Sequence, residues 1–273
     1  MHDVRYTPSR IRMRCVSRSA GKYNWLLLPG GPGLGSESLQ ILAEQLTVNG
    51  TVWLIDLPGD GSNTDMIDHT TAYERWPDVL IEAADALPNP VFIGHSTGGM
   101  YLLSVSELAT RLAGLVLISS APSARWQADF ANMCEQHPLP ESEAAAQAFS
   151  REPNVATLRA LVMASAPWNF STHTLAMGRA MLASLPFNLA AMSWSADHFD
   201  ETYEARWWPA TIPVLIISGG DDRVVAQQQW QDPRYQGDNV RQVTIPNAGH
   251  FPWYEAPDEV MEAIIQFDRS LSQ

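Results

Sequence analysis

The stretch Pro90-Val91-Phe92-Ile93-Gly94-His95-Ser96-Thr97-Gly98-Gly99 decides the fold prediction for this sequence. Its first four residues are an apolar run typical of a buried strand, and the residues from 98 to 109 have the pattern of a helix. A Gly-X-Ser-X-Gly motif alone is weak evidence, because glycine and serine are common. Between a strand and a helix, however, it predicts a sharp turn that presents a serine hydroxyl as a nucleophile.

The two glycines of the motif have a steric reason. The nucleophile of such a turn occupies a strained backbone conformation, and side chains two residues before and after it would collide. Gly94 and Gly98 remove those side chains. The N–H of Thr97, at the start of the helix, can then donate to an oxyanion. We expect His95, one position from Ser96, to be structural, since adjacent side chains point in different directions.

Outward from this stretch, apolar strands alternate with helices. Near-continuous apolar runs indicate strands covered on both faces, as in a parallel sheet. The runs are residues 25–28, 51–55, 90–93 and 115–118, and further strands are predicted at residues 214–217 and 240–245. Helical patterns cover residues 38–46, 72–87, 98–109 and 257–271. The alternation predicts an α/β fold, doubly wound, with a mostly parallel central sheet flanked by helices.

The alternation stops between residues 122 and 208. This region has no convincing buried strand, and prolines separate its helical windows. The windows are residues 141–149, 155–164, 174–185 and 189–194. Because core strands resume afterwards, we predict one core formed by residues 1–121 and 209–273, with residues 122–208 inserted into it as a helical cap.

Composition and charge exclude several classes of protein. The 273 residues include 17 basic and 30 acidic side chains, a net charge of −13, which disfavours nucleic-acid binding. No apolar run approaches about 18 residues, so no membrane span is predicted. The amino-terminal residues lack the apolar segment of a secretory signal, and Cys15 and Cys134 have no partners at metal-ligand spacing. We expect a cytoplasmic monomer or homodimer with no metal ion.

A serine nucleophile needs a base and a carboxylate that orients the base. In this type of fold the order along the chain is serine, acid, histidine. Of the seven histidines, His250 alone follows the last core strands. The acid should follow the preceding strand, where Asp221 and Asp222 are both candidates.

Together these motifs resemble the α/β-hydrolase superfamily over essentially the whole chain. The matching pieces are Gly30-Gly31-Pro32-Gly33, Asp56-Leu57-Pro58-Gly59-Asp60-Gly61-Ser62, Gly94–Gly99, Gly219–Val225 and Gly249-His250-Phe251-Pro252. The resemblance implies a helical cap over the pocket, and the Gly-X-X-Asp-X-X-Val spacing selects Asp222 over Asp221. Gly30–Gly33 is similar to the oxyanion loop of the proline iminopeptidase branch, which implies the Gly31 N–H as second oxyanion donor. Pro29 stands where that branch has histidine.

The sequence therefore predicts a serine hydrolase with an acyl-enzyme intermediate and no cofactor. We expect a small-molecule substrate, a partly apolar carboxylic ester, thioester or lactone, and we expect Trp168, Trp194 and Phe251 to contact it. The alternative is a proline iminopeptidase-like aminopeptidase, which needs a carboxylate for the substrate amine. The candidate cap carboxylates are Glu141, Glu143, Glu152, Glu201 and Glu204. A carbon–carbon bond hydrolase and a non-catalytic ligand-binding protein remain further alternatives.

Overall fold

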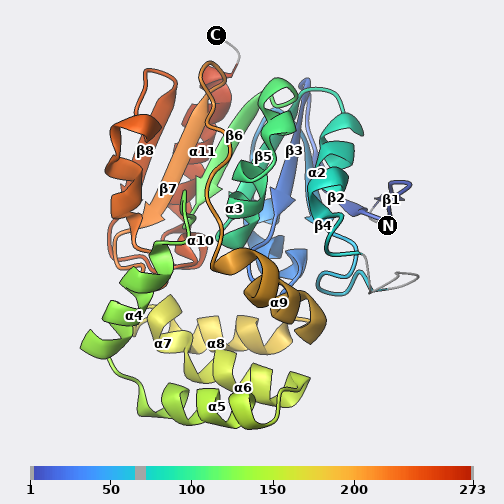
Figure 1. The fold of residues 1–273 in the computed structure, drawn as a ribbon. Coiled ribbons are helices and arrows are strands. Elements are labelled where there is room, and N and C mark those ends of the chain that lie inside the picture. Colours follow the sequence, from blue (N-terminus) through green and yellow to red (C-terminus); the bar gives the residue numbers. More distant parts are fainter. Residues whose placement is uncertain (1–2, 65–71, 272–273) are drawn as a thin grey trace.

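A computed structural model describes residues 3–64 and 72–271. Within these residues, eight strands form one sheet in the order β1-β2-β4-β3-β5-β6-β7-β8 (Figure 1). The six strands from β3 to β8 are parallel to one another. Strand β2 is antiparallel to β4, and β1 is antiparallel to β2. The strands are β1 (Val4–Tyr6), β2 (Arg12–Arg18), β3 (Tyr23–Leu28), β4 (Gly50–Asp56), β5 (Pro90–His95), β6 (Gly114–Ile118), β7 (Val214–Gly219) and β8 (Val240–Ile245).

The mostly parallel sheet flanked by helices confirms the predicted fold class. All six predicted strands are present, but β1 and β2 were not predicted. The buried residues of β2 alternate with partly exposed ones, and β1 is exposed throughout, so neither strand contains an apolar run. Both lie at one edge of the sheet, where the second face is not covered in the same way.

Helices cover both faces of the sheet. Alternate residues of a strand point to opposite faces, so Leu27 and Ile93 pack on one side, with α1 (Gln40–Gln45) and α11 (Pro257–Ser270). Leu26 and Phe92 pack on the other side, with α2 (Trp76–Asp85) and α3 (Thr97–Leu103). Short helical turns and α10 complete the connections: η1 (Ser36–Leu39), η2 (Ser106–Thr110), η4 (Gln227–Gln231), η5 (Pro233–Tyr235) and α10 (Pro252–Glu255).

The helix predicted for residues 98–109 ends earlier than expected. α3 stops at Leu103, and a separate 3₁₀ turn follows it. The carbonyl of Leu102 accepts a hydrogen bond from the indole of Trp207, and the carbonyl of Leu103 accepts one from the Arg206 N–H. These two carbonyl groups thus accept hydrogen bonds from the segment that returns from residues 122–208 to the sheet. The helix ends here because Val105, two residues on, has an extended backbone.

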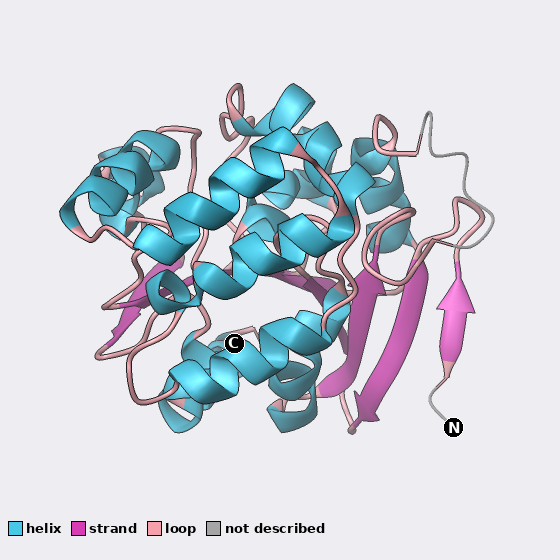
Figure 2. Ribbon diagram, turned by 90° about the horizontal axis from the view of Figure 1, so that it is seen from below, coloured by secondary structure: helices cyan, strands magenta, loops and turns pink. Residues whose placement is uncertain are grey.

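Between β6 and β7 the chain forms a group of helices beneath the sheet, at the edge where the parallel strands end (Figure 1). They are α4 (Trp126–Gln136), α5 (Pro140–Arg151), α6 (Val155–Ala164), α7 (Ala166–Asn169), α8 (Leu175–Ser184), α9 (Leu189–Ser195) and η3 (Ala196–Asp200). We call them the inserted helices; Figure 2, the view from below, shows helices in front of the strands. Apolar side chains from α6 and α8 join the same hydrophobic cluster as the strands.

The four predicted helical windows of the insertion correspond to α5, α6, α8 and α9, while α4 and α7 were not predicted. α4 has no fully buried residue, so its apolar positions form only a weak stripe, and α7 has four residues. No single helix in the described part of the chain is long and apolar enough to cross a membrane. One pair, Leu175–Ser184 with Leu189–Asp200, meets that test only when taken together, across a bend of 104°.

Candidate active site

Ser96 lies between the end of β5 and the start of α3, in a strained turn. Its φ and ψ are 50° and −124°, a conformation that costs a non-glycine residue on the order of 1–3 kcal/mol. A Cβ atom on Gly94 would lie 2.6 Å from the Gly99 Cα, and one on Gly98 would collide with the Pro29 carbonyl oxygen. The steric reason for the two glycines is therefore present in the structure.

Asp222 and His250 meet at the ends of β7 and β8. The Nδ1 atom of His250 lies 3.0 Å from Oδ2 of Asp222 and 3.2 Å from Oδ1. Both side chains are buried, with exposures of 5% for His250 and 1% for Asp222. The N–H groups of Val224 and Val225 donate to Oδ1 and fix the carboxylate. Asp221 is exposed, so the structure brings Asp222, and not its neighbour, to the imidazole.

The loop that holds His250 is anchored to the inserted helices. The His250 N–H donates to the carbonyl of Asn169, in α7, over 2.9 Å. The Glu255 carboxylate accepts from the Gly249 N–H and also from the N–H of Ser171 and the hydroxyl of Thr174. Asn169 and Glu255 were not predicted as site residues, because no local motif marks contacts between segments so far apart in sequence.

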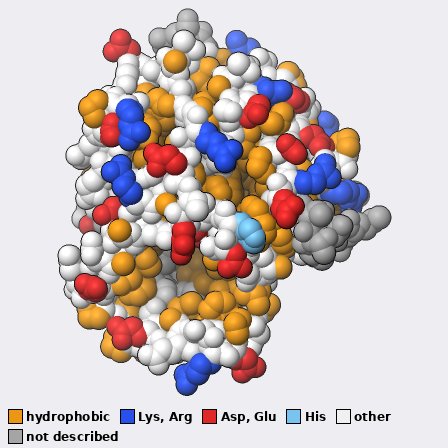
Figure 3. Space-filling model, viewed as in Figure 1, with side chains coloured by type: hydrophobic (Ala, Val, Ile, Leu, Met, Phe, Trp, Pro, Cys, Tyr) orange, Lys and Arg blue, Asp and Glu red, His pale blue; other side chains and the backbone are white. Residues whose placement is uncertain are grey.

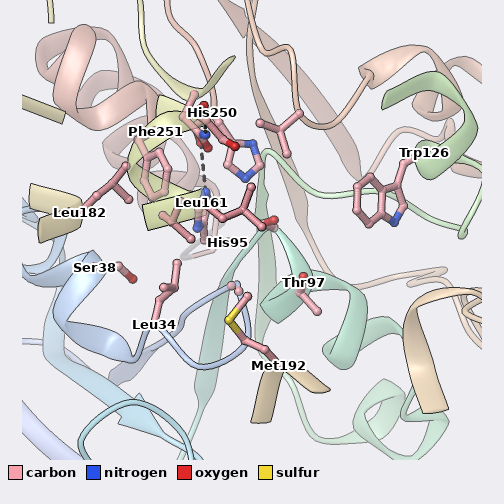
Figure 4. A pocket seen from close by; sticks show the side chains of 17 residues that line it. Leu34, Ser38, His95, Thr97, Trp126, Leu161, Leu182, Met192, His250 and Phe251 are labelled. Carbon is pink, nitrogen blue, oxygen red and sulfur yellow. Dashed lines mark hydrogen bonds between the residues drawn. The ribbon is translucent and has the colours of Figure 1, made fainter. Parts of the chain in front are cut away.

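His95 is buried behind His250. Its Nε2 atom lies 3.0 Å from the His250 carbonyl oxygen, a contact drawn as the dashed line in Figure 4. Because a carbonyl only accepts, Nε2 carries the proton and donates. Burial, followed by the nearby His250, holds the pKa of His95 well below its usual value. A neutral His95 that supports the main chain of His250 agrees with the structural role expected from the sequence.

The loop after β3 lies directly against the turn at Ser96. A Cβ atom on Gly30 would lie 2.6 Å from the Ser96 Cβ, so only glycine permits this approach. Gly31, Thr97 and Ser96 line the same pocket. The first N–H groups of a helix have no partner within the helix, so the N–H of Thr97 is available to a ligand at this position. Gly31 and Thr97, the two residues predicted to donate to an oxyanion, thus both line the pocket that contains Ser96 and His250.

The pocket is a cavity of about 210 Å³ between the sheet and the inserted helices. Its described lining residues include no Asp, Glu, Lys or Arg, and His95 and His250 are the titratable groups among them. Besides the residues described above, the pocket is lined by Leu34, Ser38, Trp126, Leu161, Val162, Ser165, Asn169, Leu182, Met192, Val224 and Phe251. Figure 4 shows Leu161, Leu182 and Phe251 beside the histidines, with Trp126 on the opposite side. Figure 3 shows that hydrophobic side chains also gather on the lower part of this molecular face, where the inserted helices lie.

Of the three side chains expected to contact substrate, Phe251 lines this pocket and the two tryptophans do not. The Trp168 indole donates to the His137 carbonyl, and its ring packs edge-on against Phe130. The ring of Trp194 packs among Tyr73, Trp76 and His198. Their placement corrects the prediction: both rings join packing contacts between helices and loops.

Phe251 should be important for stability as well as for the pocket. It is 3% exposed, stacks on Phe170 at 5.1 Å and 9°, and packs against His95 at 4.9 Å. We expect Phe251→Ala to lower the free energy of unfolding by about 3–5 kcal/mol, because it leaves a cavity. Chemical denaturation would measure this loss. Phe251→Leu, which retains most of the volume, should cost clearly less, and equal losses would contradict the packing explanation.

The described residues contain no group of three or more His, Cys, Asp or Glu side chains arranged to hold a metal ion.

Comparison with known proteins identifies the family. A model of the alpha/beta hydrolase family matches residues 25–263. The chain is 27% identical over 251 residues to a pimeloyl-[acyl-carrier protein] methyl ester esterase of Xylella fastidiosa, covering 90% of this chain and 95% of that one. Its structure is similar to a proline iminopeptidase-related protein from Thermus thermophilus (TM-score 0.70, 18% identity, 99% and 98% covered). It is equally similar to an N-acyl homoserine lactonase (TM-score 0.70, 20% identity, 100% and 98% covered). Because the family model covers most of its length, the chain belongs to the alpha/beta hydrolase family.

Proposed function

We propose that this protein hydrolyses carboxylic esters, with Ser96 as nucleophile, His250 as general base and Asp222 as the residue that orients the base. The observation that carries the proposal is the buried hydrogen bond between Asp222 and His250, at the wall of a pocket that also contains Ser96. A serine on a strained turn, a histidine and a carboxylate in this chain order are the components of nucleophilic acyl transfer.

In the proposed reaction, the Ser96 hydroxyl oxygen attacks the ester carbonyl carbon while His250 Nε2 takes the hydroxyl proton. The carbonyl π bond becomes an oxyanion, which the N–H groups of Gly31 and Thr97 stabilise. Collapse of this intermediate breaks the bond to the alcohol, and His250 returns its proton to the leaving oxygen. His250 then takes a proton from water as the water oxygen attacks the acyl carbon. When the bond between the acyl carbon and the Ser96 oxygen breaks, His250 returns this proton to Ser96, and the acid is released.

The pocket supports a small, uncharged and partly apolar acyl ester as substrate. Leucine, valine, methionine and phenylalanine side chains dominate its wall, and its volume of about 210 Å³ suits a short acyl group. The relative from Xylella fastidiosa is named for a methyl ester, which favours an oxygen ester among the esters, thioesters and lactones that the chemistry allows. Hydrolytic carbon–carbon cleavage would use the same three residues and remains an alternative reaction.

We further propose that residues 122–208 act as a cap. Leu161 in α6, Leu182 in α8 and Met192 in α9 all line the pocket, on the side opposite the strands. Through these side chains the inserted helices form one wall of the substrate cavity. They would therefore determine which acyl groups fit, whereas the turn and loops of the sheet would supply the reacting groups.

The aminopeptidase alternative receives no support from the pocket wall. A peptidase that removes an N-terminal residue must bind an ammonium group, and a buried cation without a partner is costly. Among the described pocket-lining residues there is no carboxylate, and the five candidate glutamates of the insertion are all exposed. The described lining residues thus offer the ammonium group no carboxylate beside Ser96.

A comparison of two chromogenic substrates tests the choice. We expect a short-chain acyl ester of nitrophenol to be hydrolysed with a kcat/KM at least about a hundredfold above that for proline nitroanilide, because the pocket would leave the proline ammonium unpaired. Each rate is corrected for its spontaneous hydrolysis. Comparable values would favour the aminopeptidase, and no turnover of either, without covalent labelling by a fluorophosphonate, would favour a ligand-binding protein.

A further inference from the structure

Asp60 is a buried carboxylate next to the loop that supplies Gly31. It is 2% exposed and lies in the turn after β4. Its Oδ1 atom accepts a hydrogen bond from the Gly33 N–H over 2.7 Å and another from the Gly61 N–H over 2.8 Å. Gly33 is only two residues from Gly31, so this carboxylate contacts the main chain of the candidate oxyanion loop directly.

Asn188 holds the same loop from the other side. This residue caps α9, where its side-chain oxygen accepts from the Ala191 N–H over 3.2 Å. Its own N–H donates to the Gly33 carbonyl over 2.9 Å, and its side-chain amide donates to the Gly59 carbonyl. A Cβ atom on Gly33 would lie 2.5 Å from the Asn188 carbonyl oxygen, so this contact is close. Both polar main-chain groups of Gly33 are thereby fixed, one by Asp60 and one by Asn188.

We infer that Asp60 is a positioning residue that fixes the oxyanion loop, and that its ionised form does so better than its neutral form. The inference rests on the proposed function, since it assigns Asp60 a role in aligning the Gly31 N–H with the oxyanion. A carboxylate accepts N–H hydrogen bonds about twice as strongly as a neutral acceptor. Small displacements of an oxyanion donor lower the rate of acyl transfer.

The surroundings of Asp60 bring the pKa of its carboxyl group close to neutral pH. Burial, followed by the nearby Asp56 carboxylate, raises the pKa of Asp60 to about 7, against the opposing effect of the two N–H donors. Titratable or charged groups near it are Asp56 at the end of β4, Glu37 in η1, Tyr73 before α2 and Tyr101 in α3. Arg12 pairs with Asp56 at 2.9 Å and does not offset the charge of Asp60 directly. The carboxyl group is therefore neutral below about pH 7 and charged above it.

The test compares wild type with Asp60→Asn, which keeps the shape and an acceptor oxygen but never ionises. At about pH 8.5, we expect Asp60→Asn to lower kcat roughly tenfold with KM within about twofold, because alignment acts on the transition state. At about pH 5.5, where Asp60 is protonated, the two enzymes should have nearly equal kcat. The ratio of wild-type to variant kcat should therefore fall as the pH falls, which a purely structural role would not produce.

Asp238→Asn, at an exposed position, is the matched control and should leave the ratio at about one throughout. A ratio for Asp60→Asn that is constant with pH would overturn the inference, and so would a variant faster than wild type at about pH 8.5. If Asp60→Asn does not fold, the dependence of wild-type kcat on pH is used instead. A single ionisation on the acid side of that profile would contradict a role for Asp60. The Ser96→Ala variant distinguishes failure of the proposed function from failure of the positioning role. Full activity of Ser96→Ala would refute the proposed function. An inactive Ser96→Ala, together with a ratio of wild-type to Asp60→Asn kcat that is constant with pH, would refute only the positioning role.

Discussion

Replacement of Ser96 by alanine is expected to lower kcat for a short acyl ester by a factor on the order of 10⁵ to 10⁶. The alanine retains the Cβ atom and the turn but removes the hydroxyl oxygen proposed to form the acyl-enzyme. Residual catalysis would come from the N–H groups of Gly31 and Thr97 and from substrate binding, which act without the nucleophile. Steady-state hydrolysis and mass spectrometry after fluorophosphonate treatment measure the two consequences, loss of turnover and loss of the covalent adduct.

Ser38→Ala is the matched control for this prediction. Ser38 lines the same pocket, but its hydroxyl donates to the Gly35 carbonyl over 2.8 Å, and Figure 4 shows it apart from His250. We expect this variant to react with the fluorophosphonate and to keep kcat within about tenfold of wild type. An adduct that persists in Ser96→Ala would show that another nucleophile reacts, and the proposed mechanism would then be wrong.

The central part of the fold could be predicted because it depends on local patterns. A strand buried on both faces must be apolar along most of its length, so β3 to β7 are visible in the sequence as apolar runs. Strand β1 at the edge of the sheet and its neighbour β2 are not, since their burial depends on where the sheet ends. The end of α3 at Leu103 depends on hydrogen bonds from Arg206 and Trp207, residues about a hundred positions away, and no local pattern contains that information.

The candidate site also contains residues that local motifs predict and residues that depend on tertiary contacts. Ser96, Asp222 and His250 each follow a strand and carry a motif, so strand order alone brings them to one edge of the sheet. Asn169, Glu255, Asp60 and Asn188 make hydrogen bonds to main-chain groups of other loops, and no local pattern predicts such contacts. For the tryptophans, composition suggested a pocket role, but which face of a short helix is turned inward depends on tertiary packing. Localisation and oligomeric state stay predictions.

Replacement of Asp222 by asparagine should lower kcat by a factor on the order of 10⁴, although the change is almost isosteric. Asparagine can still accept the N–H groups of Val224 and Val225 through its Oδ1 atom. Its NH₂ group would then face His250 Nδ1, in place of the Oδ2 atom now 3.0 Å away. A donor at that position selects the tautomer with a bare Nδ1 and a proton on Nε2, and this tautomer cannot take the proton of Ser96.

Asp221→Asn tests whether this loss comes from the tautomer and not from charge. The neighbouring carboxylate is exposed, so its removal changes the net charge equally but touches neither His250 nor the two valine N–H groups. We expect kcat for Asp221→Asn within about twofold of wild type, and nearly unchanged unfolding free energies for both variants. Because the neutral imidazole of Asp222→Asn has the wrong tautomer, raising the pH should not restore its kcat. Restoration to wild-type rates at high pH would contradict the explanation that Asp222 selects the tautomer of His250.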